Sequence, residues 1–180
     1  MRVTVMIPFA ALALAACGGD EVSVTNASPN EVAKKVDEAG GARFNPGEWE
    51  TTVETISVDI PGLTGPMKDQ MTQTMLNKKQ VGKTCVTPEE AKSPPAKVLA
   101  NGQGRCTYEK FTMAGGEIDG TLSCDAEGGK MTMRITGSFT GDSFAIENDM
   151  QATMPGSARL MKIKAKTSGK RLGECPAGKA

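Results

Sequence analysis

The amino-acid sequence predicts a mainly β domain: an antiparallel meander of about seven strands that forms a curved sheet or barrel-like wall, with two short helices. Apolar and polar residues alternate along most of the second half of the chain, and glycine-rich turns separate the alternating runs. The 21 Gly and 10 Pro among 180 residues indicate a chain that turns often and is not a low-complexity chain.

The N-terminus has the pattern of a bacterial secretion signal. Residues 1–16 contain Arg2, then an apolar stretch too short for the roughly 20 residues that span a bilayer. The run Leu14-Ala15-Ala16-Cys17 resembles the bacterial lipobox, which implies cleavage before Cys17 and acylation of its thiol. We therefore expect a lipoprotein anchored in the cell envelope, and Gly18 after the cysteine implies the outer membrane, with the domain facing the periplasm.

The lipidated Cys17 and the small polar residues up to position 27 are expected to form a flexible tether over 17–27. A short amphipathic helix is predicted within 28–41. Ser28, Pro29 and Glu31 match an N-cap, a first-turn proline and a capping box, and Gly40-Gly41 ends the helix.

The β domain is predicted over 45–176. Its first strand, 48–60, changes alternation phase by one residue, which is typical of a β-bulge. Met67, Met71 and Met75 predict a helix over 66–78. These methionines could bind Cu(I) through their thioethers, but packing is the preferred interpretation. A strand at 79–86, a helical turn after Thr87 and a loop at 93–104 follow.

The remaining chain is predicted to form three hairpins, whose registers agree with one another. One turns near Gly115, with strands over 105–113 and 117–125 that place Cys106 opposite Cys124. The others turn at Gly141-Asp142 and near Pro155-Gly156. Those registers pair apolar residues with apolar residues, and a slip by one residue would reverse every side chain. The predicted pairs are Met131 with Ala152, Met133 with Met150, Phe139 with Phe144, and Met150 with Ile163.

The same alternation predicts the interior of the sheet, with Trp49 as a core anchor. Flexible methionine side chains adapt to irregular apolar ligands, so this interior is also the candidate lining of a ligand site. The predicted lining residues are Trp49, Leu122, Met131, Met133, Ile135, Phe144, Ile146, Met150, Met161 and Ile163.

Four cysteines remain once Cys17 is assigned to the lipid, and an even number in an exported chain predicts two disulfides with three pairings open. The hairpin register favours Cys106 with Cys124 and leaves Cys85 with Cys175 by elimination. None of them has C-x-x-C spacing, so neither a thioredoxin-like site nor a zinc knuckle is predicted.

The composition argues against most enzyme and metal sites. The chain has no histidine, and its 21 basic and 21 acidic residues balance, which argues against nucleic-acid binding. We predict no cofactor, no metal and no catalytic residue. Glu147 and Asp149 resemble an acid/base pair, but each faces a lysine across the predicted ladder. The cationic residues of that region could instead contact anionic lipid: Lys162, Lys164, Lys166, Lys170 and Arg171.

Five motifs together resemble the proteobacterial envelope proteins catalogued as domain-of-unknown-function 3617. The resemblance covers about residues 45–176 and implies no activity or binding residue, although it supports the even number of cysteines. The motifs are Pro46-Gly47-Glu48-Trp49-Glu50, Cys85-Val86-Thr87-Pro88-Glu89, the pair Cys106 and Cys124, Gly141-Asp142-Ser143-Phe144, and Gly173-Glu174-Cys175.

The sequence therefore predicts a non-enzymatic, lipid-anchored periplasmic protein that binds an apolar molecule or a lipid. The alternative is a structural or interaction lipoprotein that contacts an envelope protein and serves envelope assembly without a small ligand. A shielded cavity would favour the first hypothesis, and a filled core with an exposed apolar patch would favour the second.

Overall fold

The structure is a computed structural model that describes residues 21–41, 44–76, 79–92, 105–126, 129–153 and 160–177. These residues form eight strands, two α-helices and one short 3₁₀ helix. The elements in chain order are β1 (Val22–Ala27), α1 (Pro29–Glu38), β2 (Gly47–Asp59), α2 (Pro66–Leu76), β3 (Gln80–Val86), η1 (Glu90–Lys92), β4 (Arg105–Ala114), β5 (Glu117–Ala126), β6 (Gly129–Phe139), β7 (Ser143–Thr153) and β8 (Leu160–Gly173).

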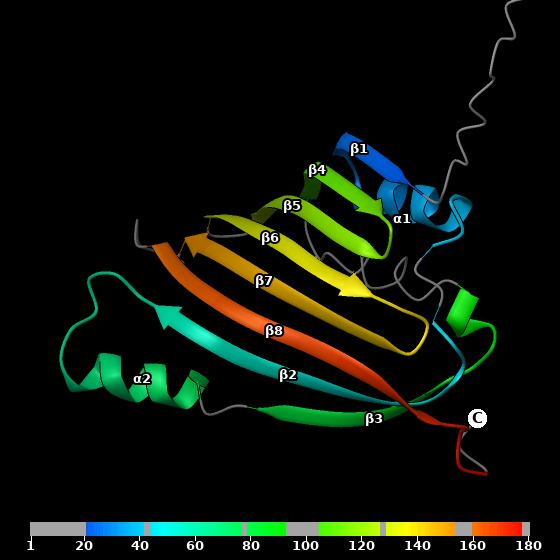
Figure 1. Cartoon of the computed structure of the whole chain (residues 1–180). Coiled ribbons are helices and arrows are strands. Elements are labelled where there is room, and N and C mark those ends of the chain that lie inside the picture. The colour runs from blue at the N-terminus through cyan, green and yellow to red at the C-terminus, as the bar shows by residue number, and fades with distance from the viewer. Residues whose placement is uncertain are drawn as a thin grey trace, which may run out of the picture.

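All eight strands belong to one antiparallel sheet in the order β1-β4-β5-β6-β7-β8-β2-β3. The sheet is curved but does not close into a barrel, so β1 and β3 are its edges (Figure 1). Helix α1 packs on β1 and β4, and α2 contacts β2 near the other edge. The predicted mainly β fold is confirmed, with one strand more than expected.

The registers within the meander agree with the sequence prediction. Cys106 lies opposite Cys124, Met133 opposite Met150, and Met150 opposite Ile163. The register between β2 and β8 shifts between Thr55 and Ser57, which is the predicted bulge. The turn predicted near Pro155-Gly156 lies outside the described residues.

The predicted tether over 17–27 is wrong for its second half. Residues Val22–Ala27 form β1, which pairs with β4, and Val22, Val24 and Ala27 are buried. The predicted signal at residues 1–16 and the predicted lipidation site at Cys17 lie outside the described residues.

Helix α1 has the predicted N-terminus. The Ser28 hydroxyl accepts a bond from the Glu31 amide, while a Glu31 carboxylate oxygen accepts one from the Ser28 amide at 2.8 Å. Val32 and Val36 are buried against the sheet. They belong to one core cluster with Val22, Val24, Ala27, Cys106, Tyr108, Phe111, Met113, Leu122, Cys124 and Ile135.

Helix α2 forms as predicted, but its methionines do not pack as expected. None of its residues is buried, and Met67 and Met71 remain 63% and 39% exposed. The interpretation of this stripe as packing surface is therefore wrong for these two residues.

Both disulfides are present in the expected pairing. Cys106–Cys124 joins the neighbouring strands β4 and β5, and Cys85–Cys175 ties β3 to the segment after β8. The second bridge closes 90 residues of sequence, so it holds the C-terminal end of the domain against the β3 edge.

Candidate functional site

The sheet has an inner face, on which α1 packs, and an outer face. Alternation along the paired strands places all ten predicted lining residues on the inner face. Their role in ligand binding stays a prediction, but the geometry that the prediction needs is present.

From β5 to β8, the predicted lining residues become less buried. Leu122 and Ile135 belong to the core, and Met131, Met133 and Ile146 are partly buried against it. Further across the sheet, Met150, Met161 and Ile163 lie outside that cluster and are partly exposed. We call Met131, Met133, Met150, Met161 and Ile163 the methionine strip.

The inner face around the methionine strip is uncharged. Along β6, β7 and β8, the described inner-face residues include a single ionised side chain, Arg171, which lies at the end of the sheet away from the methionines. Between the methionines and Arg171, the inner face carries neutral polar groups, such as Asn148 and Thr167. A ligand bound here would have to be apolar and uncharged, because the surrounding side chains offer no charge to pair with a charged ligand.

An aromatic cluster occupies the other end of the inner face. The ring centroids of Phe44 and Trp49 lie 5.0 Å apart, those of Phe44 and Phe144 lie 5.5 Å apart, and those of Trp49 and Phe144 lie 6.1 Å apart. Trp49 is only 3% exposed, so its predicted role as a core anchor is confirmed. Gly169 faces Phe144 across the strands, and a Cβ there would meet the phenyl ring.

Hydrogen bonds tie the segments around this cluster together. The Trp49 indole donates to the Asn45 carbonyl at 3.0 Å, and the Asn45 side-chain amide donates to Asp142 at 3.0 Å. Arg171 donates through Nε to the Pro46 carbonyl at 2.7 Å and forms an ion pair with Glu174. Phe44, Asn45 and the role of Arg171 were not predicted from the sequence, because the contacts that define their roles, with Phe144, Asp142 and Pro46, join distant parts of the chain.

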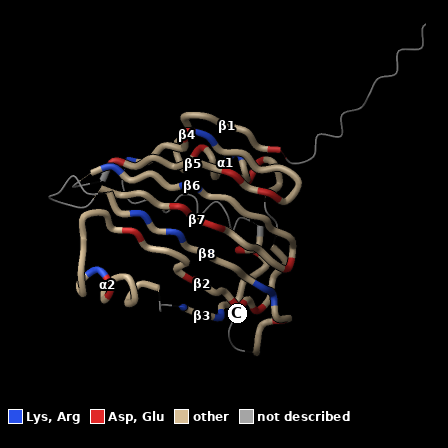
Figure 2. Tube along the Cα trace, turned by 60° about the vertical axis from the view of Figure 1, so that its left-hand side comes forward, with Lys and Arg blue, Asp and Glu red and all other residues tan. Residues whose placement is uncertain are grey.

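The ladder registers place the charged residues of β5, β6, β7 and β8 on the outer face, except Arg171. Their sign alternates from strand to strand (Figure 2). Lys164 lies 3.7 Å from carboxylate oxygens of both Glu147 and Asp149, and Arg134 lies 2.8 Å from Asp119. The predicted cross-strand ladder is therefore present. Carboxylates and lysines that neutralise one another argue against an acid/base pair and against an anion site here.

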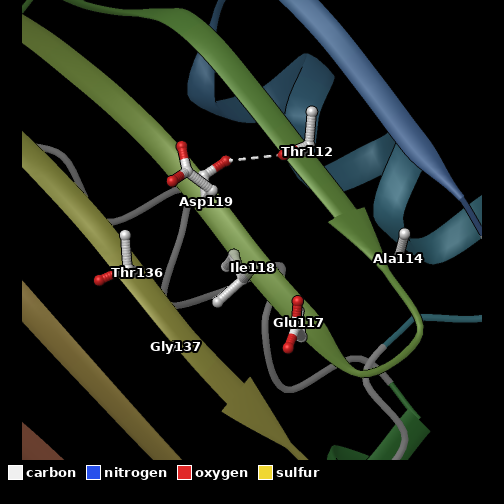
Figure 3. A pocket seen from close by; sticks show the side chains of 7 residues that line it. All are labelled: Thr112, Ala114, Glu117, Ile118, Asp119, Thr136 and Gly137. Atoms are coloured by element: carbon white, nitrogen blue, oxygen red, sulfur yellow. Dashed lines mark hydrogen bonds between the residues drawn. The ribbon is translucent and has the colours of Figure 1, made fainter.

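The outer face also holds a shallow open depression of about 370 Å³ between β4, β5 and β6. Its lining mixes carboxylates, hydroxyls and small residues (Figure 3): Thr112, Ala114, Glu117, Ile118, Asp119, Thr136 and Gly137. Asp119 is already paired with Arg134, and the Thr112 hydroxyl donates to the Asp119 carbonyl at 3.3 Å. A depression this open and polar suits water better than an apolar ligand.

Among the titratable groups of the described segments, two side chains have perturbed pKa values, and both belong to the α1 end of the fold. Burial raises the pKa of the Tyr108 hydroxyl to about 12. Hydrogen bonds from the Ser28 backbone and side chain lower the pKa of Glu31. Tyr108 packs in the core and Glu31 caps a helix, so structure accounts for both perturbations.

Within the described residues, no group of three or more His, Cys, Asp or Glu side chains is arranged to hold a metal ion. None of the helices in that part of the chain is long and apolar enough to cross a membrane.

The family model for the proteins of unknown function called DUF3617 matches residues 44–175. The chain belongs to the DUF3617 family. No curated protein and no solved structure matches the chain. The matched DUF3617 region begins after β1 and α1, which nevertheless contribute Val22, Val24, Val32 and Val36 to the core.

The motifs that carry the DUF3617 resemblance converge in space. The segment 46–50, the turn at 141–144 and the segment 173–175 are joined through Asn45 and Arg171, and Cys85 is bonded to Cys175. Four of the five motifs thus build one corner of the fold. That corner is filled by the buried Trp49, so these motifs account for architecture and leave the methionine strip as the candidate site.

Proposed function

We propose that this protein is a non-catalytic, lipid-anchored protein of the bacterial cell envelope that binds a neutral apolar ligand against the methionine strip. The ligand class that fits best is an acyl chain with an uncharged polar group. The observation that carries the proposal is the partly exposed, uncharged inner face beyond the core cluster.

Three physical arguments support this ligand class. Methionine is unbranched and polarizable, so several methionines together accommodate a flexible chain without one fixed shape. An ionised ligand would lose hydration without gaining an opposite charge, because Arg171 lies far along the face. The neutral side chains of Asn148 and Thr167 provide hydrogen-bonding groups beside the apolar strip.

Envelope anchoring rests on the sequence pattern at residues 1–17. Intact-mass measurement of the chain expressed with its own signal tests it directly. We expect the mass of a chain that begins at an acylated Cys17, whereas an unmodified mature chain would contradict the anchor.

Ligand binding is tested separately on the mature chain with Cys17→Ser behind an ordinary cleavable signal. Native mass spectrometry should reveal co-purified neutral lipid, and N-phenyl-1-naphthylamine should fluoresce when bound. Met150→Asn should weaken probe binding about tenfold, because it removes one methionine from the contact. Gln151→Asn is the matched control, since Gln151 is the next residue of β7 and lies on the outer face. Equal binding by both variants, or a lipid-free protein with no probe signal, would refute the ligand site.

An interaction lipoprotein without a small ligand is the second candidate. It is favoured by a different observation: among the residues that the structure describes, five of the seven exposed large apolar side chains belong to the stretch 53–81. A native mass without bound ligand, together with binding of an envelope protein through residues 53–81, would support that candidate instead.

A further inference from the structure

The methionines of this chain differ widely in how far water reaches them. Nine of them follow the predicted signal, and the structure describes all but one. Met67 is 63% exposed and Met71 is 39% exposed, whereas Met113 is only 3% exposed. The other described methionines, which include those of the methionine strip, are partly buried. Among the residues described, helix α2 therefore carries the two most accessible thioethers.

The other side chains that oxidants attack most readily are protected or absent. The four cysteines that follow Cys17 are joined in two disulfides, so they offer no thiol. Trp49 and Tyr108, the single tryptophan and the single tyrosine, are both buried, and the chain has no histidine. Susceptibility to oxidation follows exposure. In the described part of the chain, an oxidant in water therefore finds Met67 and Met71 the most accessible reactive groups.

An added oxygen atom has different consequences at different methionines. A sulfoxide is polar, so it disrupts a core or an apolar contact surface. At Met113 it would place an unpaired polar group in the core cluster, and on the methionine strip it would weaken the apolar surface. None of the residues of α2 is buried, so sulfoxides at Met67 and Met71 would stay in contact with water. The fold should therefore tolerate oxidation of α2 better than oxidation elsewhere.

From these observations we propose that Met67 and Met71 form an oxidation site that consumes hypohalous acid and thereby spares the methionine strip. In the reaction each thioether sulfur loses two electrons and gains one bond to oxygen. The bond between oxygen and halogen in the oxidant breaks, and a halide ion and a proton are released. The two methionines compete with the strip for a limited supply of oxidant. This inference goes beyond the ligand site and does not require a bound ligand.

The test uses the mature chain with Cys17→Ser and hypochlorite in an amount that matches the two methionines. Peptide mass spectrometry then gives the share of sulfoxide at each methionine. We expect Met67 and Met71 to carry about half of it or more in the folded chain. In a peptide digest of the same chain, where every methionine is accessible, their share should fall to two in nine.

Met67→Leu with Met71→Leu should about double the sulfoxide on the methionine strip, because the same oxidant then meets fewer competing sulfur atoms. The melting temperature should also fall more on treatment of this variant than on treatment of the wild-type chain. Met113→Leu is the matched control, since it removes a methionine by the same substitution at a buried position. It should leave the distribution of sulfoxide unchanged.

Circular dichroism of each untreated variant confirms that the domain is folded. The proposal would be overturned by a share of sulfoxide at Met67 and Met71 in the folded chain that equals their share in the digest. Equal oxidation of the methionine strip with and without the two methionines would overturn it as well. So would an equal fall in melting temperature, because α2 would then spare nothing. Each of these outcomes is measured without a ligand, so none of them depends on the ligand site.

Discussion

Gly169→Ala should destabilise the domain by closing the space that the Phe144 ring occupies. Gly169 lies directly opposite Phe144 in the β7–β8 ladder. An added Cβ would fall 2.5 Å from Cζ and 2.8 Å from Cδ1 of the ring. Phe144 cannot retreat freely, because its ring packs against both Phe44 and Trp49.

The magnitude follows from two opposing terms. Overpacking a filled core costs about 1–3 kcal/mol, whereas replacing glycine by alanine in a strand gains about 0.5–1 kcal/mol through the unfolded chain. The free energy of unfolding should therefore fall by about 1–2 kcal/mol, and the melting temperature by roughly 5 °C for a domain of this size. Trp49 is the only tryptophan in the chain and touches Phe144, so its fluorescence during urea unfolding measures the change.

Gly82→Ala provides the matched control. Gly82 also lies in a strand on the inner face, but a Cβ there would meet nothing within 4 Å. This variant should be neutral or slightly more stable. The cause is isolated by repeating Gly169→Ala in a Phe144→Leu background, where the cost should shrink. If Gly169→Ala costs as much without the phenyl ring as with it, or costs nothing in the wild-type chain, the reasoning about this cluster is refuted.

Two further predictions concern the disulfides and the buried tyrosine. Replacing Cys85 and Cys175 by alanine should lower the free energy of unfolding more than replacing Cys106 and Cys124, by about 4.5 against about 3 kcal/mol of loop entropy, because the bridges span 90 and 18 residues. Urea unfolding of the two double variants gives the order, and the reverse order would contradict the loop-entropy account. Burial raises the pKa of Tyr108 in the folded state, so folding favours its neutral hydroxyl. The stability that this hydroxyl contributes is fully present below its unfolded pKa near 10 and is lost as the pH rises towards 12. Absorbance at 295 nm reports this residue alone, since the chain has one tyrosine, and Tyr108→Phe should lessen the alkaline loss of stability.

The meander was predictable because each of its strand pairings joins segments that follow one another in the sequence. Each hairpin joins neighbouring strands, and pairs such as Met133 with Met150 fit only one register. The bulge in β2 was predictable for the same reason, because a change of alternation phase is visible in the sequence of one strand. The inner-face position of the methionine strip follows from that alternation.

The remaining features depend on contacts between distant residues. Strand β1 has six residues and pairs with β4, and its alternation is too short to distinguish it from a polar tether. The position of β2 beside β8 requires the N-terminal and C-terminal parts of the sheet to meet. The hydrogen bond from Asn45 to Asp142 spans 97 residues, and the one from Arg171 to Pro46 spans 125. The four-residue spacing of a helical stripe also cannot predict exposure, which explains why the burial of Met67 and Met71 was wrongly expected.

The contrast between the two faces decides where function is best sought. On the outer face, acidic β7 lies beside basic β8, and Lys164 is shared by Glu147 and Asp149. A face whose charges already neutralise one another gains little from a charged partner. Its exposed apolar side chains Val81, Leu160 and Leu172 lie apart, on the edge strand β3 and at the two ends of β8. On the inner face the reverse holds, because the methionine strip leaves apolar surface in contact with water and offers no charge. Burying that surface is favourable, so a ligand that covers the strip should raise the melting temperature of the domain.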